Sequence, residues 1–442
     1  MLGPLFIYSL LVIICVLAVV RPAIGLIGFY GFVLLDPAWN WRWSLEPGIA
    51  YQKYIFYALF IGFVLSGLRL QGLSRISLFA LAASGAFLGV AWLSAQSSIS
   101  PTSTDIFMAV IWKQLLVVAI GLCVLRDPKW IKVLLIVAVL AQGYNAYQIN
   151  LDYFQSGMSR FAYDTKWGNS GADNNGYSII TIPILGTAFA LALFESRIWY
   201  RSLYFGIAML QVHQIMLLQS RGCMLAGVAM VALLVWYMPR RNGNLKAVAA
   251  AFVLGAALAG PSVVEEFTSS FASGEERDSS ADSRFKLWKA GFRITTEYPL
   301  LGVGPNAARV LVPKPEYYDG GLEQSNKALH NLFFDVSTGV GIPGFLCYFT
   351  LYLLPVFYAW RTYHRDDEET GAIRLAVFAG IFGYLVASMF SSGILFESCY
   401  VLVVAGFCVS NFDEQRRREA AWDEGYEVDD DKGLEPSITS QI

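Results

Sequence analysis

The sequence predicts an all-helical, polytopic membrane protein. Hydrophobic residues make up 56% of the 442 residues and charged residues only 15%, against about 25% charged in a typical soluble domain. The apolar residues fall in runs of about 17–25, and a helix of that length crosses the roughly 30 Å hydrocarbon core of a bilayer. We therefore expect about 12–13 transmembrane helices, each of membrane-spanning length, and one long external loop.

The apolar runs give the expected spans in order along the chain. They are 5–20, 23–38, 50–68, 76–94, 106–125, 129–150, 175–194, 199–218, 222–238, 244–260, 341–360, 372–390 and 394–411. Only Arg21 and Pro22 separate the first two. The first run has no basic stretch before it and no small-residue cleavage site after it, so it is expected to be a retained helix rather than a signal peptide.

Lysine and arginine in the short loops orient the chain, because cytoplasmic loops carry an excess of both. The basic connections are "RLQGLSR", "RDPKWIK", "ESRIWYR", "PRRNGNLK" and "RTYHRDDEETGAIR", together with the tail "EQRRRE". They alternate with loops that are poorer in basic residues. Placing the basic set in the cytoplasm puts outside the segments 36–50, 95–105, 151–174, the short link at Arg221 and 261–328.

This pattern divides the chain into four parts. Residues 1–260 are expected to be transmembrane helices, 261–328 an external loop that contains a helix, 329–411 the C-terminal transmembrane helices, and 412–442 a disordered cytoplasmic tail. The tail is polar and acidic, as in "DEGYEVDDDK", a composition that does not support a packed core.

The long loop opens with a flexible polar stretch, "SSFASGEERDSSADS". The following "SRFKLWKAGFRITTEYPL" predicts a helix, with Ser283 or Asp282 able to cap its N-terminus and Pro299 ending it. "LLGVGPN" then predicts a Gly/Pro turn and "VPKPEYYDGGLEQSN" an irregular loop. From about Lys327 the chain is expected to become helical again and to enter the membrane.

Two arginines are candidates for binding an anion at the outer surface. Arg284 shares a helix face with Leu287, Trp288 and Gly291, opposite three cations; it is either an exposed first-turn residue or an arginine aimed into a cavity. Arg221, in "LLQSRGCMLAG", lies in an external link and so runs against the positive-inside pattern. It either reaches outer-leaflet phosphate or has a functional role. A guanidinium can bind phosphate oxygens through two parallel hydrogen bonds.

His330 is the candidate general base, because a neutral imidazole accepts a proton near pH 7. On a helix it would share a face with Asn326, Phe333 and Phe334, which is also what a structural histidine would do. Asp335 would point away on a continuous helix, so it is not assigned as the partner of His330.

Other polar residues give weaker indications. His213 has glutamines beside it and is expected to be hydrogen-bonded in the core, and His364 to be solvated in a cytoplasmic loop. Lys113 and Glu397, each early in a span, could line a cavity or pair with an opposite charge. Asp36, in the first external loop, is a rival catalytic carboxylate, although a turn before Pro37 is its default role.

Three segments together resemble the O-antigen ligase and polymerase family of bacterial envelope proteins. They are "SRG" at 220–222, "SRFKLWKAGFRITTEYPLLGVGPN" at 283–306 and "LHNLFFDVSTGVGIPGF" at 329–345. The resemblance is carried by an arginine and a tryptophan ahead of Tyr-Pro-Leu-Leu-Gly-Val-Gly-Pro, followed by His-Asn at the end of a long external loop.

The resemblance implies a fold like the C-type membrane glycosyltransferases and a reaction on the outer side of the bacterial inner (cytoplasmic) membrane. A glycan on undecaprenyl diphosphate would be transferred, with inversion and without a metal or other cofactor, to an acceptor, typically lipid A–core. By the motif, Arg221 and Arg284 would hold the donor diphosphate. His330 would deprotonate the acceptor hydroxyl or position it.

Other activities remain compatible with the sequence. The same family contains polysaccharide polymerases and protein O-oligosaccharide ligases, and the shared motif does not separate them. A transporter for an anionic solute, with Arg221 and Lys113 along its path, is an alternative of another class. We see no internal repeat of the kind that transporters show, and transport does not explain an external loop of about 65 residues.

Overall fold

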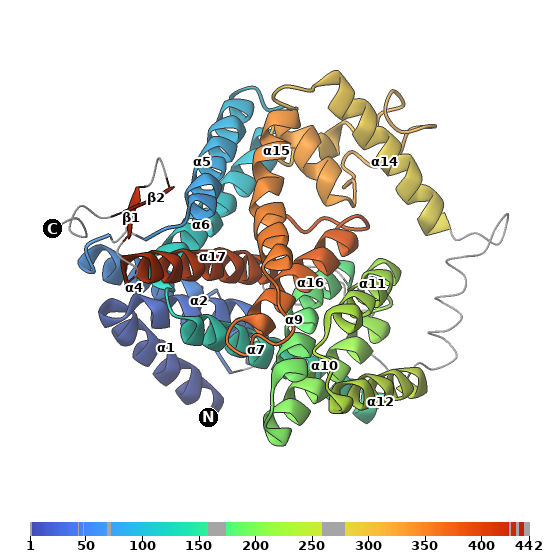
Figure 1. Cartoon of the computed structure of the whole chain (residues 1–442). Helices are drawn as coiled ribbons and strands as arrows, with labels where there is room; N and C mark the ends of the chain where they lie inside the picture. The colour runs from blue at the N-terminus through green and yellow to red at the C-terminus, as the bar shows by residue number, and fades with distance from the viewer. Residues whose placement is uncertain are drawn as a thin grey trace.

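The computed structural model describes residues 2–42, 44–46, 48–68, 72–157, 174–258, 279–423, 426–429 and 433–436. Within these residues the chain is a bundle of helices, apart from one antiparallel hairpin near the C-terminus, β1 (Tyr426–Asp429) with β2 (Gly433–Pro436) (Figure 1). The start of the long external loop, up to residue 278, lies outside the described residues.

The helices follow the predicted spans closely. The first half contains α1 (Leu2–Val20), α2 (Pro22–Leu35), the short α3 (Pro37–Asn40), α4 (Tyr51–Leu65), α5 (Arg75–Gln96), α6 (Pro101–Val124) and α7 (Pro128–Ser156). The second half contains α9 (Asn174–Phe194), α10 (Ile198–Leu217), α11 (Arg221–Tyr237), α12 (Asn242–Leu258), α14 (Ser279–Glu297), the 3₁₀ turn η2 (Ala308–Val310), α15 (Leu332–Arg361), α16 (Gly371–Ala387) and α17 (Glu397–Asp423).

This arrangement confirms the predicted fold class, because each predicted span coincides with one helix. Among the described residues, 6 helices are long and apolar enough to cross a membrane, namely α1, α5, α6, α7, α9 and α15; α2, α4, α11 and α16 are shorter apolar helices. The protein is a polytopic membrane protein. α15 begins earlier than the predicted 341 because Asn331 caps it there.

The centre of the bundle is formed by α9, α16 and the first half of α17. These helices are largely apolar around their circumference, and nearly every residue of α9 and α16 is buried, as expected of a helix without a solvent-facing side. α9 and α16 approach closely where Gly186 faces Gly380: a Cβ atom on Gly186 would lie 3.1 Å from the Gly380 Cα. Small residues allow such close crossings between membrane helices.

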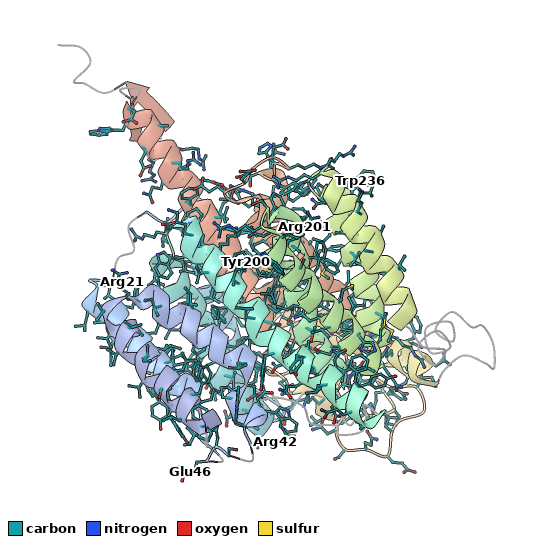
Figure 2. All side chains as sticks on the ribbon, turned by 90° about the horizontal axis from the view of Figure 1, so that it is seen from below. Arg21, Arg42, Glu46, Tyr200, Arg201 and Trp236 are labelled. Carbon is teal, nitrogen blue, oxygen red and sulfur yellow. The ribbon has the colours of Figure 1, made fainter. Side chains whose placement is uncertain are left out.

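The charged loops are distributed over the two ends of the bundle. Figure 2 shows Arg21, Arg201 and Trp236 toward one end of the helices, and Arg42 and Glu46 at the other. This is the alternation that the basic residues predict for the segments 36–50 and 195–201, which were expected on opposite sides of the membrane.

The end of α17 differs from the disordered tail predicted over 412–442, because the helix continues to Asp423. Its polar turns are joined by ion pairs along the helix, from Glu414 to Arg417 (2.7 Å) and to Arg418 (3.3 Å). Pairs at this spacing stabilise an exposed helix, so a segment without an apolar face still forms one.

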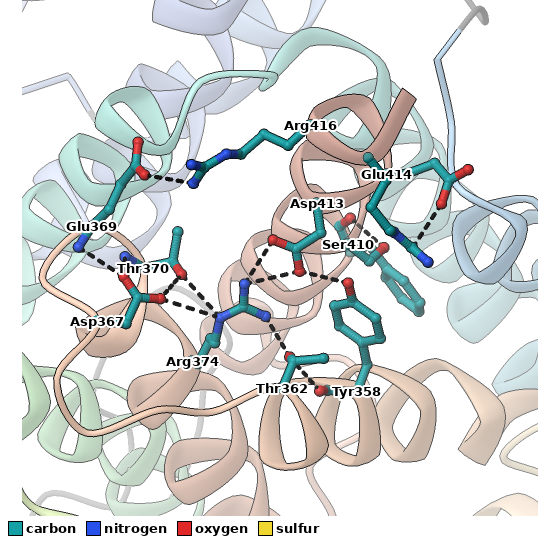
Figure 3. Close-up of polar contacts among 12 residues, drawn as sticks. Tyr358, Thr362, Asp367, Glu369, Thr370, Arg374, Ser410, Asp413, Glu414 and Arg416 are labelled. Atoms are coloured by element: carbon teal, nitrogen blue, oxygen red, sulfur yellow. Dashed lines mark hydrogen bonds and ion pairs between the residues drawn. The ribbon is translucent and has the colours of Figure 1, made fainter. Parts of the chain in front are cut away.

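A buried arginine joins three helices at the end where α17 leaves the bundle (Figure 3). Arg374, 5% exposed, donates to both carboxylate oxygens of Asp413, at 2.7 and 2.8 Å. Its other nitrogens donate to the hydroxyls of Thr370 and Thr362. The Tyr358 hydroxyl also donates to Asp413, at 2.5 Å. The ends of α15, α16 and α17 are therefore tied through one fully satisfied charge pair.

We expect Arg374→Ala to lower the free energy of unfolding by about 3–5 kcal/mol, because it leaves the Asp413 carboxylate without its buried partner. Arg416→Ala is the matched control: it removes the exposed pair with Glu369 and should cost less than about 1 kcal/mol. Thermal unfolding of the purified variants in detergent measures both. Equal losses in the two variants would contradict this account.

Candidate functional site

A Gly-rich turn after α14 packs backbone to backbone against α15. The amide of Val303 donates to the carbonyl of Thr338 (2.9 Å), and the amide of Gly304 donates to the carbonyl of Gly339 (3.2 Å). α15 is interrupted at Gly341, which has φ 70° and ψ −177°, a backbone conformation that essentially only glycine adopts. The interruption changes the course of the helix beside this turn.

Glycine is required on both sides of this contact. A Cβ atom on Gly302, which has φ 68°, would lie 2.4 Å from the carbonyl oxygen of Thr338. One on Gly341 would lie 2.3 Å from the carbonyl oxygen of Leu300. Both obstacles are backbone atoms and cannot move aside, so "LLGVGPN" and "STGVGIPG" are the two halves of one close contact.

The loop between α5 and α6, which the sequence also places outside, holds the other side of the turn. The Ile99 amide donates to the carbonyl of Val303 (3.1 Å), and the Thr104 hydroxyl donates to the carbonyl of Pro305 (2.9 Å). The turn is thus held between α15 on one side and Ile99 and Thr104 on the other. Asn306, at the end of the turn, and Arg309, just after it, are positioned with it.

His330 lies just before α15 and not on it, which corrects the helical placement predicted from Lys327 onward. Its backbone is left-handed, with φ 51°, and its side chain is half-buried. Asn331 is the N-cap: its Oδ1 accepts from the amides of Phe333 (2.9 Å) and Phe334 (3.2 Å). Positive φ is uncommon for a non-glycine residue, although histidine adopts it more readily than most.

Arg284 lies on α14 with a half-buried side chain. The helix begins at Ser279, four residues before the predicted cap at Ser283. The predicted apolar face is confirmed, because Leu287 is 1% exposed and a Cβ atom on Gly291 would lie 2.7 Å from the Phe334 ring. Arg284 therefore belongs to the side of the helix that packs toward α15.

Arg221 is the first residue of α11 and is half-buried. The residue before it, Ser220, is 1% exposed and donates to the side-chain oxygen of Asn175 at 2.9 Å. Gln219 adopts a left-handed φ of 54°. The "SRG" link is therefore a tight, anchored turn against the start of α9.

The segments that carry the three predicted residues meet at the turn between α16 and α17. A Cβ atom on Gly222 would lie 2.5 Å from the Cβ of Phe390, and the Phe390 ring lies 5.9 Å from that of Trp288. Next to it, the Asn331 side chain donates to the carbonyl of Met389 at 3.0 Å. Gly222 and Asn331 directly follow Arg221 and His330, and Trp288 lies four residues after Arg284. These contacts therefore bring the three segments together.

A cavity of about 550 Å³ lies beside this meeting point. It is bounded by the ends of α2 and α3, by α6, α7 and α9, by the turn at Pro305, and by the starts of α15 and α17. Its described lining holds four charged residues, Asp36, Arg309, Asp335 and Glu397. Arg221, Arg284 and His330 are not among the described residues that line it.

The cavity shows where several residues lie whose roles the sequence left open. Asp36 both caps α3, through the Trp39 amide at 3.3 Å, and lines the cavity. Glu397 lines it as well, whereas Lys113 is exposed and lies over the Trp112 ring. The sequence analysis missed Arg309 and Asp335. Arg309 lies in the short 3₁₀ turn η2, between the two predicted loop motifs, and Asp335 was judged only by its angle to His330 on one helix.

The cationic face of α14 is occupied by protein. Lys289 and Arg293 bind the two oxygens of Asp319, at 2.8 and 2.9 Å, and these hydrogen bonds hold the pKa of Asp319 below its ordinary value. Burial, and a hydrogen bond from its hydroxyl to Glu297, raise the pKa of Tyr317. The outward cations of α14 therefore fasten the loop 314–319.

His213 and Asn150 have a structural role in the core. His213 is 4% exposed, and its Nδ1 lies 2.5 Å from the side-chain oxygen of Asn150, as expected of a hydrogen-bonded core histidine.

The fold defines a polytopic helical membrane protein in which the segments of Arg221, Arg284 and His330 meet at one turn of the bundle. Residues 206–349 match the family model described as O-antigen ligase. This part of the chain is therefore similar to that family, whose members carry out ligase- or polymerase-type glycan transfer on lipid-linked glycans. The matched range includes Arg221, Arg284 and His330. No curated protein matches the chain.

We expect Gly302→Ala and Gly341→Ala each to lower the free energy of unfolding by more than about 1–2 kcal/mol, the cost of left-handed backbone alone for an L-residue. The backbone clash adds to this cost. Gly89→Ala in α5 is the control, because a Cβ atom there meets nothing within 4 Å and alanine favours the helix. Thermal unfolding checks the stability, and wild-type stability of either turn variant would show that the close contact is not required.

Proposed function

We propose that the protein transfers a glycan from an undecaprenyl-diphosphate donor to an acceptor hydroxyl on the periplasmic side of the bacterial inner membrane. The acceptor in this proposal is lipid A–core, and the reaction is inverting and uses no metal. The observation that carries the proposal is that the Arg221, Arg284 and His330 segments meet at the turn of Met389 and Phe390. These three segments lie in the residues 206–349 that match the O-antigen ligase family model.

The two arginines suit a diphosphate leaving group. When the bond between glycan and diphosphate breaks, the lipid diphosphate gains negative charge. Preorganised guanidinium groups near the membrane surface stabilise that charge, and the lower dielectric there strengthens the interaction. In this proposal Arg221 and Arg284 grip the diphosphate, and each acts through a paired hydrogen-bonding edge that lysine lacks.

His330 is assigned to the acceptor hydroxyl, which must lose its proton as it attacks the sugar. An imidazole can accept that proton near neutral pH. The left-handed backbone at His330 and the cap at Asn331 support this role, because they hold the imidazole at a defined place at the head of α15.

Alanine at His330 is expected to reduce glycan transfer by about 10²–10⁴-fold, and alanine at Arg284 by about 10²–10³-fold. Arg284→Lys should restore only part of the activity, because the guanidinium fork is lost. Transfer is measured in membranes with equal protein levels. His364→Ala and Lys286→Ala, at a loop and at the Tyr318 ring, are the matched controls. Undiminished transfer by both site variants would refute the assignment.

The acceptor is tested separately. Purified protein is given the lipid-linked glycan with lipid A–core, with a second lipid-linked repeat, or with an acceptor protein. Transfer to lipid A–core supports the ligase, whereas preferential use of either other acceptor would replace it by a polymerase or a protein O-oligosaccharide ligase.

A further inference from the structure

The cavity beside the site is lined by polar atoms that have no partner in the described structure. The buried atoms Gln142 Oε1 and Ser398 Oγ make no hydrogen bond there, and both residues line the cavity together with Asp335 and Ser392, which hydrogen-bond to each other. Gln142 is 2% exposed and Ser398 is fully buried. Buried polar groups are normally hydrogen-bonded, so their gathering around one cavity indicates a polar ligand.

These groups present mainly acceptors. The Gln142 amide nitrogen donates to the carbonyl of Leu34 at 3.0 Å, which leaves its oxygen as an acceptor. The carboxyl groups of Asp335 and Glu397 each offer at least one acceptor oxygen in either protonation state. A lining that accepts hydrogen bonds is complementary to a ligand that donates them, such as one with several hydroxyl groups or an ammonium group.

The charge of the lining points the same way. Its described residues include three carboxylates, Asp36, Asp335 and Glu397, and one guanidinium, Arg309. Three carboxyl groups against one guanidinium disfavour a phosphate or a uronic acid in this space, because a lining with more acceptors than cationic donors leaves an anionic ligand unmatched. Trp39 and Phe396 also line the cavity and offer flat apolar surfaces of the kind found in small-molecule sites.

We propose that this cavity binds a hydroxyl-rich sugar without an acidic group, neutral or amino-substituted, and rejects acidic sugars. The inference rests on the proposed function, since the sugar belongs to either the transferred glycan or the acceptor. It divides the substrate between two places: the anionic diphosphate at the arginines, and the uncharged or cationic sugar among the carboxylates.

The test uses three soluble probes with purified protein in nanodiscs: methyl glucoside, methyl glucosaminide and methyl glucuronide. Saturation-transfer NMR, which detects weak binding, measures each affinity. We expect the first two to bind and the glucuronide to bind at least about tenfold more weakly. In the variants Asp335→Asn and Glu397→Gln, methyl glucosaminide should lose about tenfold in affinity, as expected on loss of a charge-assisted contact.

Asp319→Asn is the matched control, because it removes a carboxylate that binds only Lys289 and Arg293 and should leave probe binding unchanged. Both cavity variants are close in shape to the native residues, and their folding is verified by thermal unfolding. Absence of binding by the neutral and amino probes, equal binding of the glucuronide, or unchanged binding in both cavity variants would each overturn the proposal.

Two further measurements separate this proposal from the function itself. His330→Ala should retain probe binding while losing transfer, so lost transfer with intact binding supports both proposals. If the site variants transfer glycan normally but the cavity variants no longer bind the probes, the proposed function is refuted and the proposed sugar-binding cavity is still supported. In the transfer assay, the cavity variants should raise the KM of whichever substrate supplies the sugar, donor or acceptor, and an unchanged KM for both would overturn the cavity assignment.

Discussion

The close contact between the turn after α14 and the interrupted helix α15 is the constraint on which the rest of the site depends. Its hydrogen bonds join two backbones directly, through Val303 and Thr338, and side chains at Gly302 or Gly341 would collide with carbonyl oxygens. Because the contact involves no side chain that can change rotamer, it holds the external loop in one register. The position of Arg309, which follows the turn, depends on that register.

The same helix is anchored at its other end. Arg374 ties the end of α15 to α16 and α17 through Thr362 and Asp413, at the far end of α15 from His330. The turn between α16 and α17 then reaches back to Asn331 and to the segment at Gly222. α15, α16 and α17 therefore form a frame that is fixed at both ends, and the site is assembled on one end of it.

The structure also separates two kinds of electrostatic environment. The arginine-bearing segments gather around Phe390, whereas the adjoining cavity carries Asp36, Asp335 and Glu397. The donor in the proposed function, which joins an anionic diphosphate to a polar glycan, would match this division of charge. Complementarity of this kind supplies orientation, because the reversed pose would place phosphate beside carboxylates and sugar beside guanidinium groups.

The sequence by itself determined the membrane class, the order of the helices and the segments that carry Arg221, Arg284 and His330. Runs of apolar residues and local motifs are encoded within short windows, and the spans predicted from them each coincide with a helix. Only the tertiary structure decided that His330 precedes α15 in a left-handed conformation, and that Asp36, Arg309, Asp335 and Glu397 share one cavity. These residues come from four separate segments, so no local pattern relates them. Their meeting depends on glycine contacts and a helix interruption that sequence periodicity does not show.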